Sequence, residues 1–257
     1  MHAPRTRSLE RFRLDGLRAL ITGAGRGLGK ACAVALADAG AEVVIMSRTA
    51  SELENLRDQI KNDGGKAEIA VCNAANADQI NEIIPDLGRL DILVNNAGTN
   101  IPEAFTEVSA ANFDAIMNLN VRGVFLMAQA VVKEMLKRGH GGSIINMSSQ
   151  MGHVGAPNRT VYCASKHAIE GLTKAMGVEL APKGIRVNSV GPTFIETPLT
   201  KPFFDNAEFA KDTLARIPLA KLGQVEDVAD AVVYLASPAA GMVTGGSLLV
   251  DGGWTAR

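Results

Sequence analysis

The chain has 257 residues, of which 47% are hydrophobic and 21% are charged, so it has the composition of a folded globular protein. That length allows one large domain or two small ones. The 26 Lys and Arg residues nearly cancel the 27 Asp and Glu residues, which argues against a nucleic-acid partner. No apolar run approaches the roughly 18 residues that cross a bilayer, so we also expect no membrane partner.

The cysteines and the first residues indicate where the protein resides. Cys32, Cys72 and Cys163 are sparse and odd in number, which is typical of a reduced, cytoplasmic chain rather than of a disulfide scaffold. Residues 1–12 are basic but contain no apolar core, so we predict a flexible N-terminal tail, with a transit peptide as the alternative.

Short apolar runs alternate with helical patterns along the rest of the chain. We predict strands at 17–22, 41–46, 66–72, 91–94, 143–147, 185–190 and 247–250. Helices are expected at 27–39, 51–62, 78–87, 109–138, 160–180 and 225–235. This alternation is typical of a parallel sheet covered on both faces. We therefore predict an α/β fold: one doubly wound, Rossmann-type domain over 13–257 with a seven-stranded parallel sheet.

The first predicted strand is followed directly by Gly23, Gly25, Gly27 and Gly29. Glycines leave room for a pyrophosphate, and the N-terminus of the next helix supplies amide donors to it. The spacing departs from strict G-x-G-x-x-G, so a plain tight turn is the alternative. The position in the first strand–helix turn favours dinucleotide binding.

The second predicted strand ends at Ser47 and Arg48, where an NAD site usually has an acidic residue. A small neutral residue and a guanidinium suit a 2′-phosphate instead, and Arg26 adds a second positive charge. We predict NADP(H) as the preferred cofactor, with NAD(H) as the alternative. A solvated Arg48 at a helix start is the other interpretation.

Tyr162 and Lys166 are four residues apart in a helical pattern, so both side chains lie on one face. A tyrosine with a pKa near ~10 is a weak acid at neutral pH, and a neighbouring ammonium lowers that pKa. The pair therefore indicates a general acid/base. Ser149, at the exit of the fifth strand, adds a hydroxyl at the sheet edge where ligands bind.

The stretch 193–218 interrupts the alternation. Prolines at 198, 202 and 218 separate the apolar side chains of Phe194, Leu199, Phe203, Phe204 and Phe209. A long structureless stretch in a compact domain is usually a functional lid, so we predict a lid here. A surface excursion without function is the alternative.

Four motifs together resemble one family. The segment TGAGRGLG at 22–29, NNAG at 95–98, Ser149, and Tyr162-x-x-x-Lys166 match the order and spacing of the short-chain dehydrogenases/reductases. The resemblance extends from about residue 13 to VDGG at 250–253. It implies that Tyr162 transfers the proton, that Lys166 binds the nicotinamide ribose and lowers the pKa of Tyr162, and that Ser149 holds the substrate oxygen. It also implies that Asn120 holds a water of the proton relay, and we assign no metal ligands.

The resemblance extends the expected cofactor site from the glycine loop to the base of the lid. It places Asn96 and Gly98 beside the adenosine and Val121 near the adenine. Two departures stand out, because Asn73 replaces a usual Asp and Thr193 replaces a usual Gly. The complete set of expected cofactor contacts is Gly23, Arg26, Gly27, Leu28, Gly29, Ser47, Arg48, Asn73, Ala74, Asn96, Ala97, Gly98, Val121, Tyr162, Lys166, Pro192, Thr193, Ile195 and Thr197.

Residues near the expected nicotinamide position would select the substrate. Besides Ser149 and Tyr162 we expect contacts from Gln150, Met151, His153 and Asn158, although a lone loop histidine is often structural. Gln150 suits a hydroxylated substrate, and the ending DGGWT resembles those of sugar-acid and polyol dehydrogenases. We therefore favour a secondary alcohol–ketone interconversion on a sugar acid or polyol, in the gluconate 5-dehydrogenase-like branch.

Two other functions stay open. A 3-oxoacyl-thioester reductase would use a basic patch for its carrier protein, and Lys201, Lys211, Arg216 and Lys221 could form one. A non-catalytic NADP(H)-sensing scaffold is the second alternative. The resemblance also implies a homotetramer. In support, the predicted helix at 109–138 has more apolar residues than one sheet face needs: Phe113, Met117, Val124, Phe125, Ala128, Val131 and Val132. The alternative is that all of them face the sheet.

Overall fold

The computed structural model describes residues 8–197, 200, 204–205 and 207–256. Its centre is one sheet of seven strands in the order β3-β2-β1-β4-β5-β6-β7, and every neighbouring pair is parallel. Each predicted strand is confirmed to within two residues at either end. The strands are β1 (Arg18–Thr22), β2 (Glu42–Ser47), β3 (Lys66–Val71), β4 (Ile92–Asn95), β5 (Gly142–Met147), β6 (Ile185–Pro192) and β7 (Ser247–Val250).

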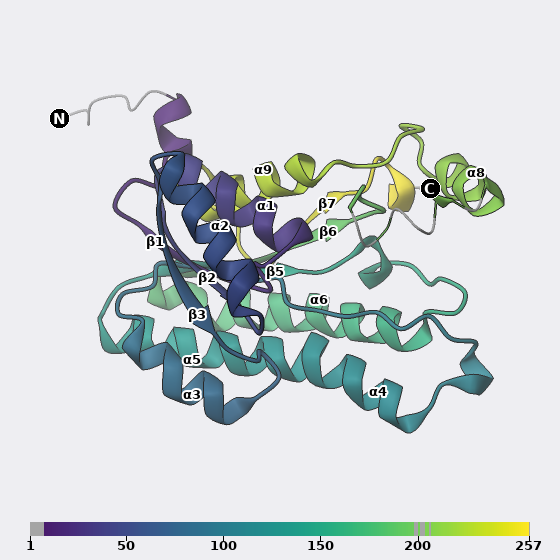
Figure 1. The fold of residues 1–257 in the computed structure, drawn as a ribbon, viewed down its shortest axis with the longest axis horizontal. Coiled ribbons are helices and arrows are strands. Elements are labelled where there is room, and N and C mark those ends of the chain that lie inside the picture. The colour runs from purple at the N-terminus through teal and green to yellow at the C-terminus, as the bar shows by residue number, and fades with distance from the viewer. Residues whose placement is uncertain (1–7, 198–199, 201–203, 206, 257) are drawn as a thin grey trace.

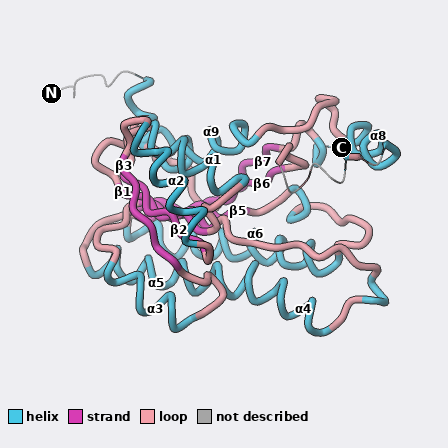
Figure 2. Tube along the Cα trace, in the orientation of Figure 1, coloured by secondary structure: helices cyan, strands magenta, loops and turns pink. Residues whose placement is uncertain are grey.

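Helices cover both faces of this sheet (Figure 1). One layer contains α1 (Gly27–Asp38), α2 (Ala50–Asn62) and α9 (Val225–Ala236); the other contains α3 (Ala77–Asp86), α4 (Ala110–Met117), α5 (Val124–Lys137) and α6 (Thr160–Leu180). Figure 2 shows the strands running between these two groups. Two aliphatic cores result, one on each face. The doubly wound α/β prediction is confirmed.

The strand order reverses between β1 and β4. From β1 the chain proceeds outward through β2 to β3, and then returns to the other side of β1 as β4. At such a switch point the loops that follow the two strands diverge and open a crevice at the carboxyl ends of the strands. The glycine loop after β1 and the NNAG segment after β4 border this crevice.

The single helix predicted at 109–138 is interrupted in the structure. A π-helical turn, η3 (Asn118–Gly123), separates α4 from α5. Ser109 caps α4 by accepting a hydrogen bond from Asn112 N at 3.1 Å. A π turn adds one residue to the helical repeat and is frequent at functional sites. It places Asn120 inside the protein, where only 1% of the residue is exposed.

The stretch Ala110–Lys137 is long and apolar enough, by length and composition, to cross a membrane. It is instead a core helical segment, because Met127, Ala128, Val131 and Val132 pack in the core beneath the sheet. The predicted apolar residues therefore divide. The valines and the alanine face inward, whereas Phe113 and Phe125 are 46% and 45% exposed.

Two segments are more ordered than expected. Ser8–Phe12 form a 3-10 helix, and Arg11 Nη2 donates to the Pro238 carbonyl at 3.1 Å, so this part of the predicted flexible tail packs on the domain. Within the predicted structureless lid, Ala207–Arg216 form helix α8. Thr213 and Ile217 are both buried and lie four residues apart, a spacing that places them on one face of a helix and so favours a helix there. Pro198, Leu199, Lys201, Pro202 and Phe203 lie outside the described residues.

Candidate active site

A cleft of about 680 Å³ opens at the carboxyl edge of the sheet. Its walls come from the loops that follow strands β1 to β6 and from the start of α6. The glycine loop and the Tyr162–Lys166 pair therefore line one continuous cavity, although more than 130 residues separate them in sequence.

The glycine loop is held by backbone contacts. Asn96 Nδ2 donates to the carbonyls of Thr22 at 3.0 Å and Gly23 at 3.1 Å, and Ala24 N donates to Met46 O at 3.0 Å. A Cβ at Gly29 would collide with the Gly23 carbonyl oxygen and with Asn96. Only glycine therefore fits at that position, and the first amides of α1 are brought to the cleft, where they can hold an anion.

Charged side chains of both signs border the glycine loop. Arg26 and Arg48 are exposed, line the cleft and form no ion pair with any described residue. Ser47, which replaces the usual acid, bonds locally with the backbone of Thr49. Glu52, which no sequence motif marked, also lines the cleft, and its carboxylate lies against Gly25. The net local charge is positive, which suits a phosphate.

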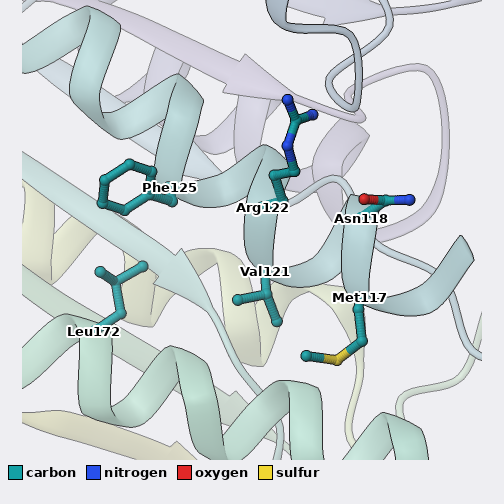
Figure 3. Close-up of a pocket in the computed structure, with 6 residues that line it drawn as sticks. All are labelled: Met117, Asn118, Val121, Arg122, Phe125 and Leu172. Atoms are coloured by element: carbon teal, nitrogen blue, oxygen red, sulfur yellow. The ribbon is translucent and has the colours of Figure 1, made fainter. Parts of the chain in front are cut away.

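The adenine side of the expected site differs from the prediction at one residue. Val121 does not line the cleft; it borders a separate hollow on the helical layer with Phe125 and Leu172 (Figure 3). Leu119 lines the cleft in its place. Residues two apart lie on opposite sides of a helical turn, so Leu119 and Val121 line different hollows, and the adenine contact of Val121 stays a prediction. At the end of β3, the Asn73 side-chain oxygen accepts from Ala75 N at 3.1 Å and shapes the turn there.

Tyr162, Lys166 and Ser149 meet in the cleft, as predicted. Helix α6 places the Lys166 ammonium 5.5 Å from the centroid of the Tyr162 ring, and the same Nζ donates to the Met147 carbonyl at 2.8 Å. Ser149 begins the short 3-10 helix η4 (Gln150–Gly152) and accepts from Met151 N at 3.1 Å. The end of β5 thus fixes both the lysine and the serine.

Burial changes the pKa values of this pair. It raises the pKa of Tyr162 above its ordinary value, while the Ser149 hydroxyl and the positive charge of Arg159 oppose the rise. Burial therefore outweighs the groups that lower the Tyr162 pKa, and the lowering expected from Lys166 stays a prediction. Burial also lowers the pKa of Lys166 to about 8, and the Glu170 carboxylate opposes that fall.

Asn120 does not line the cleft. Its amide nitrogen donates to Thr99 O at 2.8 Å and Ser165 Oγ at 3.1 Å, and its oxygen accepts from Thr99 N at 2.8 Å. The side chain therefore ties the segment after β4 to α6. This contact positions the helix that carries Tyr162, and the expected water contact stays a prediction.

The predicted substrate contacts divide. Gln150 and Met151 line the cleft, but His153 and Asn158 do not. His153 Nε2 lies 3.1 Å from Ser247 Oγ and 3.4 Å from a Glu170 carboxylate oxygen. Asn158 occupies a left-handed turn with φ 57°, and its carbonyl accepts from Glu103 N at 3.0 Å. These contacts hold the loop before α6, and substrate contacts of His153 and Asn158 stay predictions.

Several cleft residues missing from the prediction border the substrate side, and Arg159 is the charged one among them. Its place three residues before Tyr162 was the only sequence signal for it. Four buried polar atoms of the cleft have no hydrogen-bond partner within the described part of the chain: Ser148 Oγ, Gln150 Oε1, Thr193 Oγ1 and Asn100 Oδ1. Buried polar atoms are rarely left unpaired in proteins, so these atoms are suited to a polar ligand.

The base of the predicted lid is anchored to the sheet. Pro192, Thr193, Ile195 and Thr197 line the cleft as expected. Thr193 N donates to Val250 O at 3.1 Å, and Ile195 pairs with Gly223 in an isolated bridge. Phe194 lines the cleft too, and its ring packs against those of Phe204, Phe209 and Trp254 at 5.7–5.9 Å.

Comparisons with known proteins show which family has a similar sequence. Residues 23–255 match the family model described as enoyl-(acyl carrier protein) reductase. The chain is 41% identical to L-xylulose reductase of Mus musculus over 95% of this chain and 98% of that one. It is 40% identical to the 3-oxoacyl-[acyl-carrier-protein] reductase FabG of Thermotoga maritima, over 94% and 99%.

A solved structure adds a ligand to the comparison. The gluconate 5-dehydrogenase of Burkholderia cenocepacia, in complex with NADP and tartrate, superposes with a TM-score of 0.94. It is 39% identical to this chain, and the match covers 98% of this chain and 100% of that one. With the glycine cradle and the Ser149, Tyr162 and Lys166 constellation in place, these matches show that the chain belongs to the short-chain dehydrogenase/reductase family.

Proposed function

We propose that the protein interconverts a secondary alcohol and a ketone on a sugar acid or polyol, and that it prefers NADP(H). One observation carries this proposal: the Ser149, Tyr162 and Lys166 side chains line the same cleft as the glycine cradle. A general acid/base is thus held beside a dinucleotide site, which is the arrangement that alcohol oxidation and ketone reduction need.

The residues present fit a phosphorylated dinucleotide. The glycine cradle and the first amides of α1 suit the pyrophosphate, and Arg26 and Arg48 suit a 2′-phosphate. When bound, this cofactor accepts or supplies the hydride. The NADP complex of the Burkholderia cenocepacia relative supports the same preference. Glu52 provides the acceptor that a ribose hydroxyl of NAD(H) would use, so NAD(H) is the alternative.

The protein's own groups manage the proton. Tyr162 donates a proton to the substrate oxygen during reduction and removes it during oxidation, while the Ser149 hydroxyl holds the same oxygen. Lys166 holds the ribose and supplies positive charge beside the phenol. Asn120 positions α6 and holds a relay water. Coupling proton and hydride movement avoids a free alkoxide at the carbinol carbon.

The choice of a hydroxylated substrate rests on the polar lining. Gln150 Oε1 and Thr193 Oγ1 are buried and have no hydrogen-bond partner among the described residues, and substrate hydroxyls would satisfy them. The names of two relatives, L-xylulose reductase and gluconate 5-dehydrogenase, refer to a sugar and to a sugar acid, which are hydroxylated substrates too. The FabG relative supports the second candidate, a 3-oxoacyl-thioester reductase. In the basic patch that this candidate would use on this chain, however, Arg216 is paired with Asp212 at 2.9 Å.

A substrate panel tests the proposal. Purified protein with NADP⁺ or NADPH is mixed with sugar acids, polyols, their ketones and a 3-oxoacyl thioester, and absorbance of the reduced cofactor is followed. We expect the highest kcat/KM with a sugar acid or polyol. A higher value with the thioester would support the second candidate. Tight NADP(H) binding without turnover of any compound would instead support the sensing scaffold.

We further propose that the enzyme is a cytoplasmic homotetramer with a lid over 193–218. The exposed rings of Phe113 and Phe125, and the apolar hollow beside Val121 and Leu172, offer surface for subunit contact. Three free, buried cysteines suit a reducing compartment. Sedimentation at micromolar concentration is expected to show four subunits, and a monomer would contradict the assembly.

A further inference from the structure

Arg159 lies at the N-terminus of α6, the helix that carries Tyr162 and Lys166. It is the N-cap residue of α6, and its carbonyl accepts from Cys163 N at 2.8 Å, so the helix itself sets its backbone. Its side chain makes no capping hydrogen bond and lines the cleft. The guanidinium is close enough to Tyr162 for its charge to oppose the rise in the tyrosine pKa.

Within the described residues, the Arg159 guanidinium forms no ion pair and no hydrogen bond. Among the arginines that the structure describes, most form ion pairs or donate to carbonyls, and the unpaired ones apart from Arg159 are Arg26, Arg48 and Arg122, which are exposed. Arg159 is partly buried, and this burial lowers its pKa. Removing a cation from water without a counter-ion costs free energy, and an anionic ligand offsets that cost.

This positive charge lies away from the phosphate end of the cleft. Arg26 and Arg48 follow β1 and β2, on one side of the switch point, whereas Arg159 precedes α6 on the side of Ser149 and Tyr162. An anion bound by Arg159 therefore belongs to the molecule whose oxygen meets Tyr162. On the same side, Gln150 is 1% exposed and its Oε1 has no partner among the described residues, so it lines the cleft as an acceptor for a hydroxyl.

We propose that Arg159 binds a carboxylate of the substrate, so that the enzyme prefers a polyhydroxy acid to the neutral polyol of the same carbon chain. This inference rests on the proposed function, because it concerns the substrate of that same site. A planar guanidinium can hold both carboxylate oxygens in parallel hydrogen bonds. Gln150 Oε1 and Thr193 Oγ1 then accept from hydroxyls of the same molecule. A neutral polyol leaves the partly desolvated charge unpaired.

The test compares one aldonic acid with the alditol of equal length as substrates for the full-length enzyme with NADP⁺. We expect wild type to favour the acid in kcat/KM. Arg159→Met is expected to lower the acid-to-alditol ratio by about 100-fold, the size of losing a charged bidentate contact. Arg159→Lys keeps the charge without the planar fork and is expected to give an intermediate ratio.

A matched control and a second readout separate this role from a structural one. Arg138→Gln removes one positive charge beyond the end of α5, at the opposite edge of the sheet, and is expected to leave the ratio unchanged. Titration of the NADP⁺-loaded protein with tartrate, followed by calorimetry, is expected to show binding by wild type and loss of binding by Arg159→Met.

The outcomes distinguish the two proposals. If wild type turns over the alditol as well as the acid, or if Arg159→Met leaves the ratio unchanged, the role of Arg159 is contradicted while the oxidoreductase proposal stands. If wild type oxidises neither compound and no other sugar acid or polyol, the proposed function itself fails.

Discussion

The two ends of the cleft are built differently. At the cofactor end the backbone of the glycine loop is held in place: the Asn96 side-chain amide donates to the Thr22 and Gly23 carbonyls, and Ala24 N donates to the Met46 carbonyl. At the substrate end side chains dominate, and Ser148, Gln150 and Thr193 carry buried atoms without partners in the described residues. The glycine loop is therefore held in place before any ligand binds, whereas the substrate end has buried polar atoms that a ligand can satisfy.

The largest expected effect is at the substrate end. Tyr162→Phe removes the proton donor, so we expect kcat to fall by about 1,000-fold while NADPH affinity stays within about twofold. Steady-state kinetics and fluorescence titration measure the two quantities. Tyr234→Phe, which alters the chain's other tyrosine at its contact with Phe12, is the matched control and is expected to keep full activity. Full activity in Tyr162→Phe would overturn the mechanism.

At the cofactor end, a substitution that disturbs the backbone of the glycine loop is expected to have the next largest effect. Gly29→Ala forces a methyl group against the Gly23 carbonyl, so we expect a stability loss of about 1–3 kcal/mol and weaker NADPH binding. Gly171→Ala on α6 has open space and is expected to be neutral or stabilising by up to about 1 kcal/mol. Denaturant unfolding and NADPH titration check both variants. Equal behaviour of the two would contradict the close-packing account.

Cofactor choice is expected to depend on opposing charges. Arg48→Ala removes a 2′-phosphate contact and is expected to lower the ratio of kcat/KM for NADPH over NADH by about tenfold. Glu52→Gln removes a repelling carboxylate and is expected to raise the same ratio. If wild type prefers NADH, or if both variants move the ratio in one direction, the charge argument fails.

The pH dependence of ketone reduction reports on Lys166. Reduction needs the charged ammonium, so its rate is expected to fall as pH rises through about 8, the lowered pKa of this lysine. Because the Glu170 charge raises that pKa, Glu170→Gln is expected to move the fall to lower pH. Ser189→Ala removes a hydrogen-bond donor to the same carboxylate but keeps its charge, so its midpoint is expected to match wild type. An unchanged midpoint in Glu170→Gln would contradict this assignment.

The smallest expected effect is at His153. Its ring bonds toward Ser247 and Glu170 rather than into the cleft, so His153→Gln is expected to leave KM for the substrate within about twofold. A rise of tenfold or more would return His153 to the substrate site.

Most of the residues expected at the cofactor end do line the cleft, because residues adjacent in sequence build that end. Four alternating glycines after the first strand, and arginines after the first and second strands, are local sequence signals. The position of Val121 beside a separate hollow could not be predicted, because it lies in the π turn η3 and no composition rule marks such a turn. The contacts of His153 could not be predicted either, because its partners, Glu170 and Ser247, come from distant elements.

Buried polar contacts were equally invisible to the sequence. Asn95, Asn146 and Thr173 form a hydrogen-bonded chain from β4 through β5 to α6, at 3.0 and 2.9 Å. Each residue alone resembles a surface polar residue, and only the parallel register of β4 and β5 brings the two amides together. The unpaired charge of Arg159 could not be predicted for a related reason, because it depends on which groups surround the guanidinium in space.

Deuterium transfer tests the central claim, that a hydride and a proton meet at the Ser149 and Tyr162 end of this cleft. Wild-type enzyme reduces a keto acid of the preferred class with NADPH that carries deuterium at both C4 positions, and the product is analysed by mass spectrometry. We expect one deuterium on the new carbinol carbon and none there when the label is in the solvent. A product with no cofactor deuterium, or with solvent deuterium on that carbon, would contradict the account.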